Sequence, residues 1–251
     1  LFRQEYPSNE MEAFLTSGRC FVEDNVLSAA EEECYTPDFI GELSQSQLYE
    51  RDSGPYREWH RPMDNESYVI GADIAEGLSH GDYSCAQVLD ARGRQVACYH
   101  GHVDPWEFGE ILSQLGQRYN GAYMVVERNN HGLTTLRRLQ EINYPSMFVE
   151  SSVDGAYGDK MTKRGGFLTT SKTKPLIIDN LAALIRQRDA GVADVNLIRE
   201  LRTYVINEKG ATNAQSGCYD DRVMAFAIAL HGLATMPRPK RLLAPRRFEA
   251  V

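Results

Sequence analysis

The stretch YVIGADIA, residues 68–75, is a short and almost continuous apolar run that contains one carboxylate, Asp73. Runs of this length and composition are typical of buried strands. Two further strand-like runs follow at 83–90 and 94–100, joined by a glycine-containing turn. The segment 68–100 is therefore predicted to form a three-stranded antiparallel meander, with the carboxylate in its first strand.

Helical patterns follow the meander. Asp104 and Pro105 supply an N-cap and a proline at the first helical position, which predicts that a helix begins there. A buried strand over 122–126 then ends at Glu127. The remaining predicted elements are a short strand at 146–149 and helices at 105–119, 132–142, 174–189, 195–206 and 219–235. This order predicts an α/β fold, in which helices flank a mixed sheet made of an antiparallel meander plus parallel strands.

Both ends of the chain lack this regular pattern. Residues 1–66 are rich in Glu, Ser and Tyr, and we interpret them as a linker and the edge of a missing N-terminal domain, with short helices at 9–15, 27–33 and 44–51. Residues 67–235 form the predicted main domain, and residues 236–251 a basic, proline-containing tail that is extended or disordered. Because the chain begins without Met or a signal peptide, we interpret it as a fragment of a longer protein.

Composition argues against several classes of protein. No apolar stretch is long enough to span a membrane, so no membrane partner is expected. The five cysteines show no C-x-x-C spacing, which argues against a zinc site or a disulfide framework and favours a reducing cytoplasm. The net charge of -8 is unfavourable for binding nucleic acid. However, basic residues are concentrated at 238–247, and a carboxylate site that binds metal ions must itself be acidic.

Acidic residues stand at the ends of three predicted elements. Asp73 lies in the first strand, Glu127 ends the fourth, and Asp221 opens the last helix. Such carboxylates can converge on one end of a sheet and hold two Mg²⁺ or Mn²⁺ ions about 4 Å apart, the arrangement that hydrolyses phosphodiesters. We predict that Asp73 bridges both ions while Glu127 and Asp221 each hold one, which makes these three the candidate catalytic residues. Asp220 is the alternative to Asp221, and Asp82 is a candidate outer ligand.

Each of these residues also has a structural interpretation. An aspartate in a strand is usually a turn former, and Asp220 with Asp221 could be an N-cap pair favoured by the helix dipole. His131 is expected to order the turn before the next helix, and His100 and His102 lack a third partner for a metal site. The occurrence of three carboxylates in the order that one sheet end requires favours the functional interpretation.

Several motifs resemble the nuclease domain of the large terminase subunit of tailed double-stranded DNA bacteriophages. The segment FRQEYP (2–7), followed by EAF (12–14) and SG (17–18), is similar to the connection between that family's ATPase and nuclease domains. The family has three acidic motifs, and this chain has a similar segment for each. The first is similar to GAD (71–73) with GDYS (81–84), the second to VERNNHG (126–132), and the third to YDD (219–221) before an alanine-rich helix. The motifs occur in the family's order, and the resemblance covers most of the chain.

The resemblance implies a ribonuclease H-like fold and two-metal cleavage of concatemeric double-stranded DNA during genome packaging, in the cytoplasm of the host cell. It also implies assembly with a small terminase subunit and a portal protein, as a pentamer in the full-length form. The chain contains no G-x-x-x-x-G-K-[ST] motif, so ATP-driven packaging is expected to reside in a missing N-terminal ATPase domain.

A basic segment at 155–170 reads as a mobile hairpin, although a solvated loop is the alternative interpretation. Together with the stretch that follows it, this segment matches a region of the family that lies near the active site and is expected to touch DNA. The candidate DNA-binding residues are Lys160, Lys163, Arg164, Lys172 and Lys174.

Two other functions use the same residues. A transposase or junction resolvase of the same fold would share the acidic triad, but a resolvase should prefer branched DNA. In a non-catalytic DNA-binding or assembly module, the acidic cluster would be a structural remnant. Metal-dependent nicking of a plasmid separates that module from the nucleases.

Overall fold

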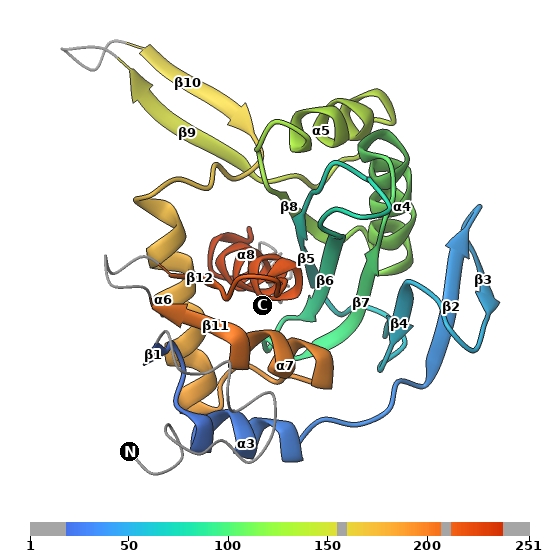
Figure 1. Ribbon diagram of the computed structural model, residues 1–251. Coiled ribbons are helices and arrows are strands. Elements are labelled where there is room, and N and C mark those ends of the chain that lie inside the picture. The colour runs from blue at the N-terminus through green and yellow to red at the C-terminus, as the bar shows by residue number, and fades with distance from the viewer. Residues whose placement is uncertain (1–18, 155–159, 207–211, 238–251) are drawn as a thin grey trace, which may run out of the picture.

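The computed structural model describes residues 19–154, 160–206 and 212–237, and within them seven strands form one mixed sheet (Figure 1). The strand order is β3-β2-β4-β7-β6-β5-β8. The bounds are β2 (Phe39–Ser44), β3 (Gln47–Glu50), β4 (Tyr56–Glu58), β5 (Tyr68–Asp73), β6 (Ser84–Asp90), β7 (Gln95–Gly101) and β8 (Tyr123–Val126). The predicted meander is confirmed, since β5, β6 and β7 pair antiparallel. β8 returns parallel to β5, which makes the sheet mixed as predicted.

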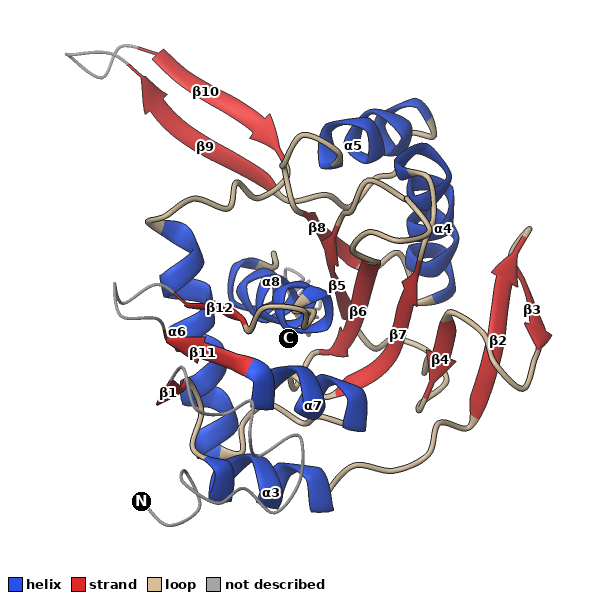
Figure 2. Ribbon diagram, viewed as in Figure 1, coloured by secondary structure: helices blue, strands red, loops and turns tan. Residues whose placement is uncertain are grey.

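Helices cover both faces of this sheet (Figure 2). On one face lie α4 (Pro105–Arg118) and α5 (Gly132–Glu141). On the other face lies α8 (Asp221–Thr235), backed by α3 (Asp24–Glu32), α6 (Thr173–Gln187) and α7 (Val195–Thr203). The alternation of side chains along β5 explains the two layers: Val69 joins the core under α8, whereas Tyr68 and Ile70 join the core under α4. Among the described helices, none is long and apolar enough to cross a membrane.

The predicted start of α4 is confirmed. The Asp104 carboxylate accepts hydrogen bonds from the backbone N–H groups of Trp106 at 2.8 Å and Glu107 at 3.4 Å, and Pro105 occupies the first helical position. The cap satisfies backbone donors that have no partner inside the helix.

Smaller sheets complete the fold. A three-stranded sheet contains β1 (Arg19–Cys20), β11 (Tyr204–Ile206) and β12 (Thr212–Ala214). A two-stranded hairpin of β9 (Val149–Asp154) and β10 (Lys160–Gly165) projects from the body of the molecule (Figure 1). All five cysteines are free thiols.

Several sequence predictions were wrong in detail. The helix expected at 44–51 is instead the turn and second strand of the β2–β3 hairpin, whose turn residues Gln45 and Ser46 have positive φ. The helix expected at 195–206 ends at Thr203, because residues 204–206 pair as β11. The strand expected at 146–149 is reduced to a bridge between Met147 and Met124. At 204–206 the competing influence is pairing with the distant β1, whereas at 44–51 it is hairpin pairing with the neighbouring β2. In both cases strand pairing overrides local helical propensity.

The predicted domain limits stay a prediction. Three strands of the central sheet, however, come from within residues 1–66, the segment interpreted as a linker. The helix expected at 27–33 is present as α3. The helix expected at 9–15 and nearly all of the tail from 236 onward lie outside the described residues.

A buried ion pair fastens this N-terminal part of the sheet to α4. Glu58 of β4 is only 1% exposed and accepts two hydrogen bonds from Arg118, at 2.7 and 2.8 Å. The hydroxyls of Tyr56 and Tyr119 donate to the same carboxylate at 2.6 and 3.1 Å. The carboxylate is therefore fully paired, as a buried charge must be.

The helix α8 comes very close to the sheet at Gly71 of β5. A Cβ atom added to Gly71 would lie 2.2 Å from the backbone nitrogen of Ala229 and 2.3 Å from the carbonyl oxygen of Ala225. Only a residue without a side chain allows the two backbones to come this close. Gly71 therefore sets the depth at which α8 rests on β5.

We expect Gly71→Ala to lower the free energy of unfolding by about 1–3 kcal/mol, because the added methyl must displace the backbone of α8. Chemical denaturation monitored by circular dichroism measures this change. Gly81→Ala is the matched control, since the nearest atom to its added Cβ lies at 3.6 Å. Equal stability of the two variants would contradict the proposed contact.

Candidate active site

Two carboxylates meet where β5 and β8 end side by side. Asp73 is the last residue of β5, and Glu127 directly follows β8. The parallel register pairs Ala72 with Val126, and the Glu127 N–H donates to the Ala72 carbonyl at 2.8 Å. The next residue of each strand therefore lies at the same end of the sheet. Asp73 is half-buried, and Glu127 is 7% exposed.

The third carboxylate comes from the N-terminus of α8. Asp221 is the first residue of this helix and is 5% exposed. Its Oδ2 accepts a 3.4 Å hydrogen bond from the Tyr83 N–H and lies 3.7 Å from His100 Nε2. Because α8 rests on β5 at Gly71, its N-terminal turn comes beside the end of that strand.

These carboxyl groups are close enough to raise one another's pKa. Burial raises the pKa of Asp73 well above its usual value, and the charge and hydrogen bond of Glu127 raise it further. Asp221 and Asp220 contribute smaller repulsions in the same direction. Burial also raises the pKa of Asp220, and the exposed Asp82 adds to that effect. The structure thus brings all five predicted acidic residues to one end of the sheet.

Little positive charge balances this cluster. Lys174 Nζ lies 3.5 Å from Asp220 Oδ2 and donates to Asn213 Oδ1 at 3.0 Å. Arg222 follows Asp221 in sequence, but its guanidinium pairs with Glu200 at 2.6 Å and with Asp194 at 3.4 Å. The guanidinium is thereby engaged by α7 and its N-cap, and it also lies 3.2 Å from His100 Nε2.

Asn129 holds the Glu127 side chain, a role that the sequence reasoning missed. Its Nδ2 donates to Glu127 Oε2 and to the Ile74 carbonyl, both at 2.9 Å, and its Oδ1 accepts from the Gly132 N–H at 2.6 Å. The prediction that His131 orders this turn was wrong, since His131 makes no side-chain cap to α5. An Asn placed three residues after a strand and three before a glycine was the available signal.

The five carboxylates suit a hard divalent cation, which prefers oxygen ligands and would relieve their mutual repulsion. In the part of the chain that the structure describes, no group of three or more His, Cys, Asp or Glu side chains is arranged to hold a metal ion. The oxygen donors therefore fit a metal ion in their chemistry, although the described side chains are not positioned to coordinate one.

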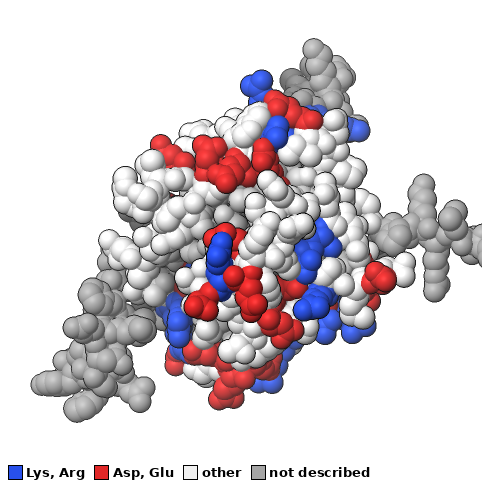
Figure 3. Space-filling view, turned by 90° about the vertical axis from the view of Figure 1, so that its right-hand side faces the viewer, with Lys and Arg blue, Asp and Glu red and all other residues white. Residues whose placement is uncertain are grey.

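The predicted DNA-binding residues lie in two places. Lys163 and Arg164 are exposed on β10, and Lys172 is exposed just before α6. Lys174 instead lies in the acidic cluster. Lys160 belongs to β10, but its side chain is outside the described part of the structure. On the face that carries the β2–β3 hairpin, acidic side chains gather in patches (Figure 3), which is unfavourable for binding phosphate.

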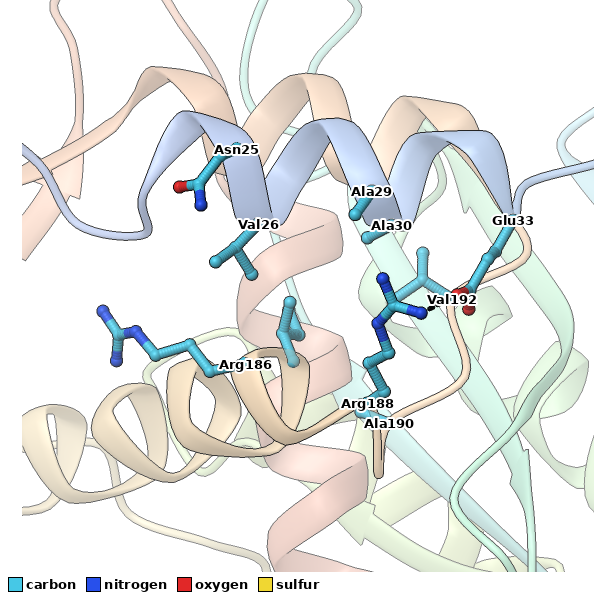
Figure 4. A pocket seen from close by; sticks show the side chains of 10 residues that line it. Asn25, Val26, Ala29, Ala30, Glu33, Arg186, Arg188, Ala190 and Val192 are labelled. Carbon is cyan, nitrogen blue, oxygen red and sulfur yellow. Dashed lines mark ion pairs between the residues drawn. The ribbon is translucent and has the colours of Figure 1, made fainter.

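A separate cavity of about 240 Å³ lies between α3 and the end of α6 (Figure 4). Val26, Ala30 and Val192 form part of its apolar wall, and none of the acidic cluster lines it. Arg188 at its edge pairs with Glu33 at 3.5 Å. We assign no function to this cavity.

Comparison with known proteins identifies the fold. No family model matches the chain, and no curated protein is significantly similar in sequence. The large terminase nuclease from thermophilic phage G20c with bound magnesium is 20% identical, over 82% of this chain and 96% of that one, with a TM-score of 0.59. The large terminase nuclease domain of Thermus phage P74-26 is 24% identical over 81% and 93%, with a TM-score of 0.54. The chain thus has the ribonuclease H-like fold of large terminase nuclease domains.

We expect Asp73→Asn to be more stable than the unchanged chain at neutral pH in a chelating buffer. The substitution removes one charge from a group of like charges, and a gain of about 1 kcal/mol is typical when such a site is neutralised. Thermal unfolding measures the difference. Because the raised pKa of Asp73 lets the carboxyl bind a proton on acidification, the advantage should shrink as the pH falls. A variant less stable at every pH would contradict the repulsion.

Proposed function

We propose that this protein is a metal-dependent endonuclease that cuts concatemeric double-stranded DNA during viral genome packaging. The observation that carries the proposal is geometric: Asp73 and Glu127 end two neighbouring parallel strands, and Asp221 opens the helix that packs on β5. The fold shared with phage large terminase nucleases supports the same assignment.

The cofactor that we propose is a pair of Mg²⁺ or Mn²⁺ ions. Structures of the G20c nuclease contain magnesium, cobalt or zinc, which supports a site for divalent ions. In this chain Asp73 would be shared between the ions, with Glu127 on one and Asp221 on the other. When bound, such ions make a water nucleophilic and stabilise the leaving oxygen of the phosphodiester.

The surrounding residues keep the carboxylates in place. Asn129 fixes one oxygen of Glu127, and the Tyr83 N–H contacts Asp221. Glu200 accepts hydrogen bonds from the backbone N–H groups of Arg222 at 2.8 Å and Val223 at 3.3 Å, which holds the first turn of α8. Such fixed side chains reduce the reorganisation that binding of ions and substrate requires.

The ion pair between Lys174 and Asp220 bears on which aspartate is the ligand. The Asp220 carboxylate is already engaged by Lys174, whereas the polar contacts of Asp221 within the described segments are the Tyr83 N–H and His100. We therefore assign Asp221 as the metal ligand. Asp220 would instead position Lys174 so that its ammonium group can contact a phosphate. Asp82, exposed on the loop before β6, is left as an outer ligand or a group that orients water.

The DNA path that we propose runs from the acidic cluster past the β9–β10 hairpin and the start of α6. Lys163, Arg164 and Lys172 are exposed there and can contact phosphates without reading sequence. By likeness to large terminases, we further propose that the full-length protein carries an ATPase domain. It would act as a pentamer with a small terminase subunit and a portal protein, in the host cell cytoplasm.

We expect Asp73→Ala to reduce Mg²⁺-dependent cleavage of plasmid DNA by roughly a hundredfold or more, because it removes the ligand shared by both ions. Gel analysis of nicked and linear products measures the rate, and circular dichroism checks folding. Asp179→Ala, an exposed carboxylate of α6, is the matched control. Normal cleavage by Asp73→Ala would refute the assignment, as would a Mn²⁺-soaked crystal with no anomalous peak between Asp73 and Asp221.

We expect Lys163→Ala combined with Arg164→Ala to weaken duplex binding and to reduce the slope of log K against log salt by about 2, since each phosphate contact contributes about 0.9. Fluorescence anisotropy over a range of salt concentrations measures the slope. Arg51→Ala with Arg188→Ala removes two exposed arginines outside the proposed path and serves as the control. A slope unchanged from the parent would remove the hairpin from the path, and preferential cutting of four-way junctions would favour a resolvase.

A further inference from the structure

We propose that a stack of three aromatic rings beside the acidic cluster, formed by His100, Tyr83 and His102, binds a nucleobase of single-stranded DNA. We call this stack the aromatic ladder. The proposal rests on the proposed nuclease function and specifies the kind of DNA that the site receives.

Strand pairing builds the aromatic ladder. His100 and His102 stand two residues apart at the end of β7, so their side chains point to the same face of the sheet. The register pairs Ser84 with Gly101, which places Tyr83 opposite His102. The Tyr83 ring lies between the two imidazoles, with centroids 4.3 Å from His100 and 3.9 Å from His102, and both pairs are stacked.

Exposure increases from one end of the aromatic ladder to the other. The side chain of His100 is only 9% exposed, Tyr83 is half-buried, and His102 is exposed. Tyr219 meets Tyr83 edge-on at 5.3 Å and is itself 44% exposed. Packing accounts for the buried rings, whereas the outer ring of His102 is left open. A base placed on that ring would lengthen the stack, and such stacking accepts any base because every base has a π-face.

The aromatic ladder is in direct contact with the acidic cluster. The N–H of Tyr83 contacts Asp221 Oδ2, and His100 Nε2 lies 3.7 Å from that oxygen. Asp82 directly precedes Tyr83, and Tyr219 directly precedes the pair 220–221. The stack therefore starts beside the acidic cluster at His100 and extends outward to the exposed His102, where a base would be added.

Positive charge for the sugar–phosphate backbone of a bound strand is available on the same face. Arg57 of β4 pairs in register with Cys98, two residues before His100 on β7, so Arg57 shares the face of the aromatic ladder. An arginine beside stacked rings is a common combination in sites for single strands.

This geometry distinguishes between forms of DNA. Bases inside an intact duplex are already stacked on one another and cannot reach an aromatic platform. The aromatic ladder would therefore engage a strand that is locally unpaired, such as a frayed end, a gap or a melted segment beside the cleavage position. The duplex beyond it would still follow the basic residues of the hairpin.

The test compares single-stranded and duplex binding by the 251-residue chain in EDTA, where no cleavage occurs. The probe is an oligonucleotide of about 16 nucleotides carrying 2-aminopurine, either alone or annealed to its complement. We expect His102→Ala with Tyr219→Ala to weaken single-strand binding about tenfold and to abolish the quenching of 2-aminopurine, with less than about a twofold effect on the duplex. His102→Phe should retain both signals, because stacking needs the ring and not its nitrogens.

The control is Tyr49→Ala, which removes a ring that is 42% exposed on the edge strand β3. Equal losses on single strands and duplex, or no loss at all, would overturn the proposal, and so would failure of His102→Phe to retain binding. Plasmid cleavage by the unchanged chain is scored separately. Binding through the aromatic ladder without cleavage would refute the nuclease and leave the ladder standing, whereas cleavage with intact binding by the double alanine variant would do the reverse.

Discussion

The close contact between α8 and β5 at Gly71 is the constraint on which the acidic site depends. Ala225 and Ala229 present their backbone to a strand residue that has no side chain, so helix and sheet approach more closely than larger residues allow. Asp221 stands at the start of that helix, and Asp73 stands two residues beyond the glycine. The depth of the helix on the sheet therefore sets how near the two carboxylates come.

Gathering five carboxylates at one end of a sheet works against folding, because burial and like charge both oppose ionisation. The surrounding structure offsets that cost with apolar burial along α8 and with hydrogen bonds that fix the positions of the acidic residues. Glu200 fixes the first turn of α8, and Asn129 fixes the Glu127 side chain. Such a group of like charges is an instance of the usual compromise between stability and function.

Local signals predicted the parts of the fold that local physics controls. The meander follows from apolar runs separated by short turns, and α4 begins where Asp104 and Pro105 predicted. Prediction failed where strand pairing overrode helical propensity: the residues at 44–51 form the turn and second strand of a hairpin on the edge of the sheet. His131 looked like the residue that orders its turn, but the hydrogen bonds belong to Asn129.

By itself, the sequence determined the order of the elements from β5 to β8 and the position of an acidic residue in or beside three elements, because these depend on neighbours in the chain. Tertiary structure alone decided that Asp220 meets Lys174 while Asp221 meets the Tyr83 N–H, and that two histidines and a tyrosine stack beside them. These contacts join segments as much as 138 residues apart. Strand register and helix docking create such contacts, and both are properties of the folded chain as a whole.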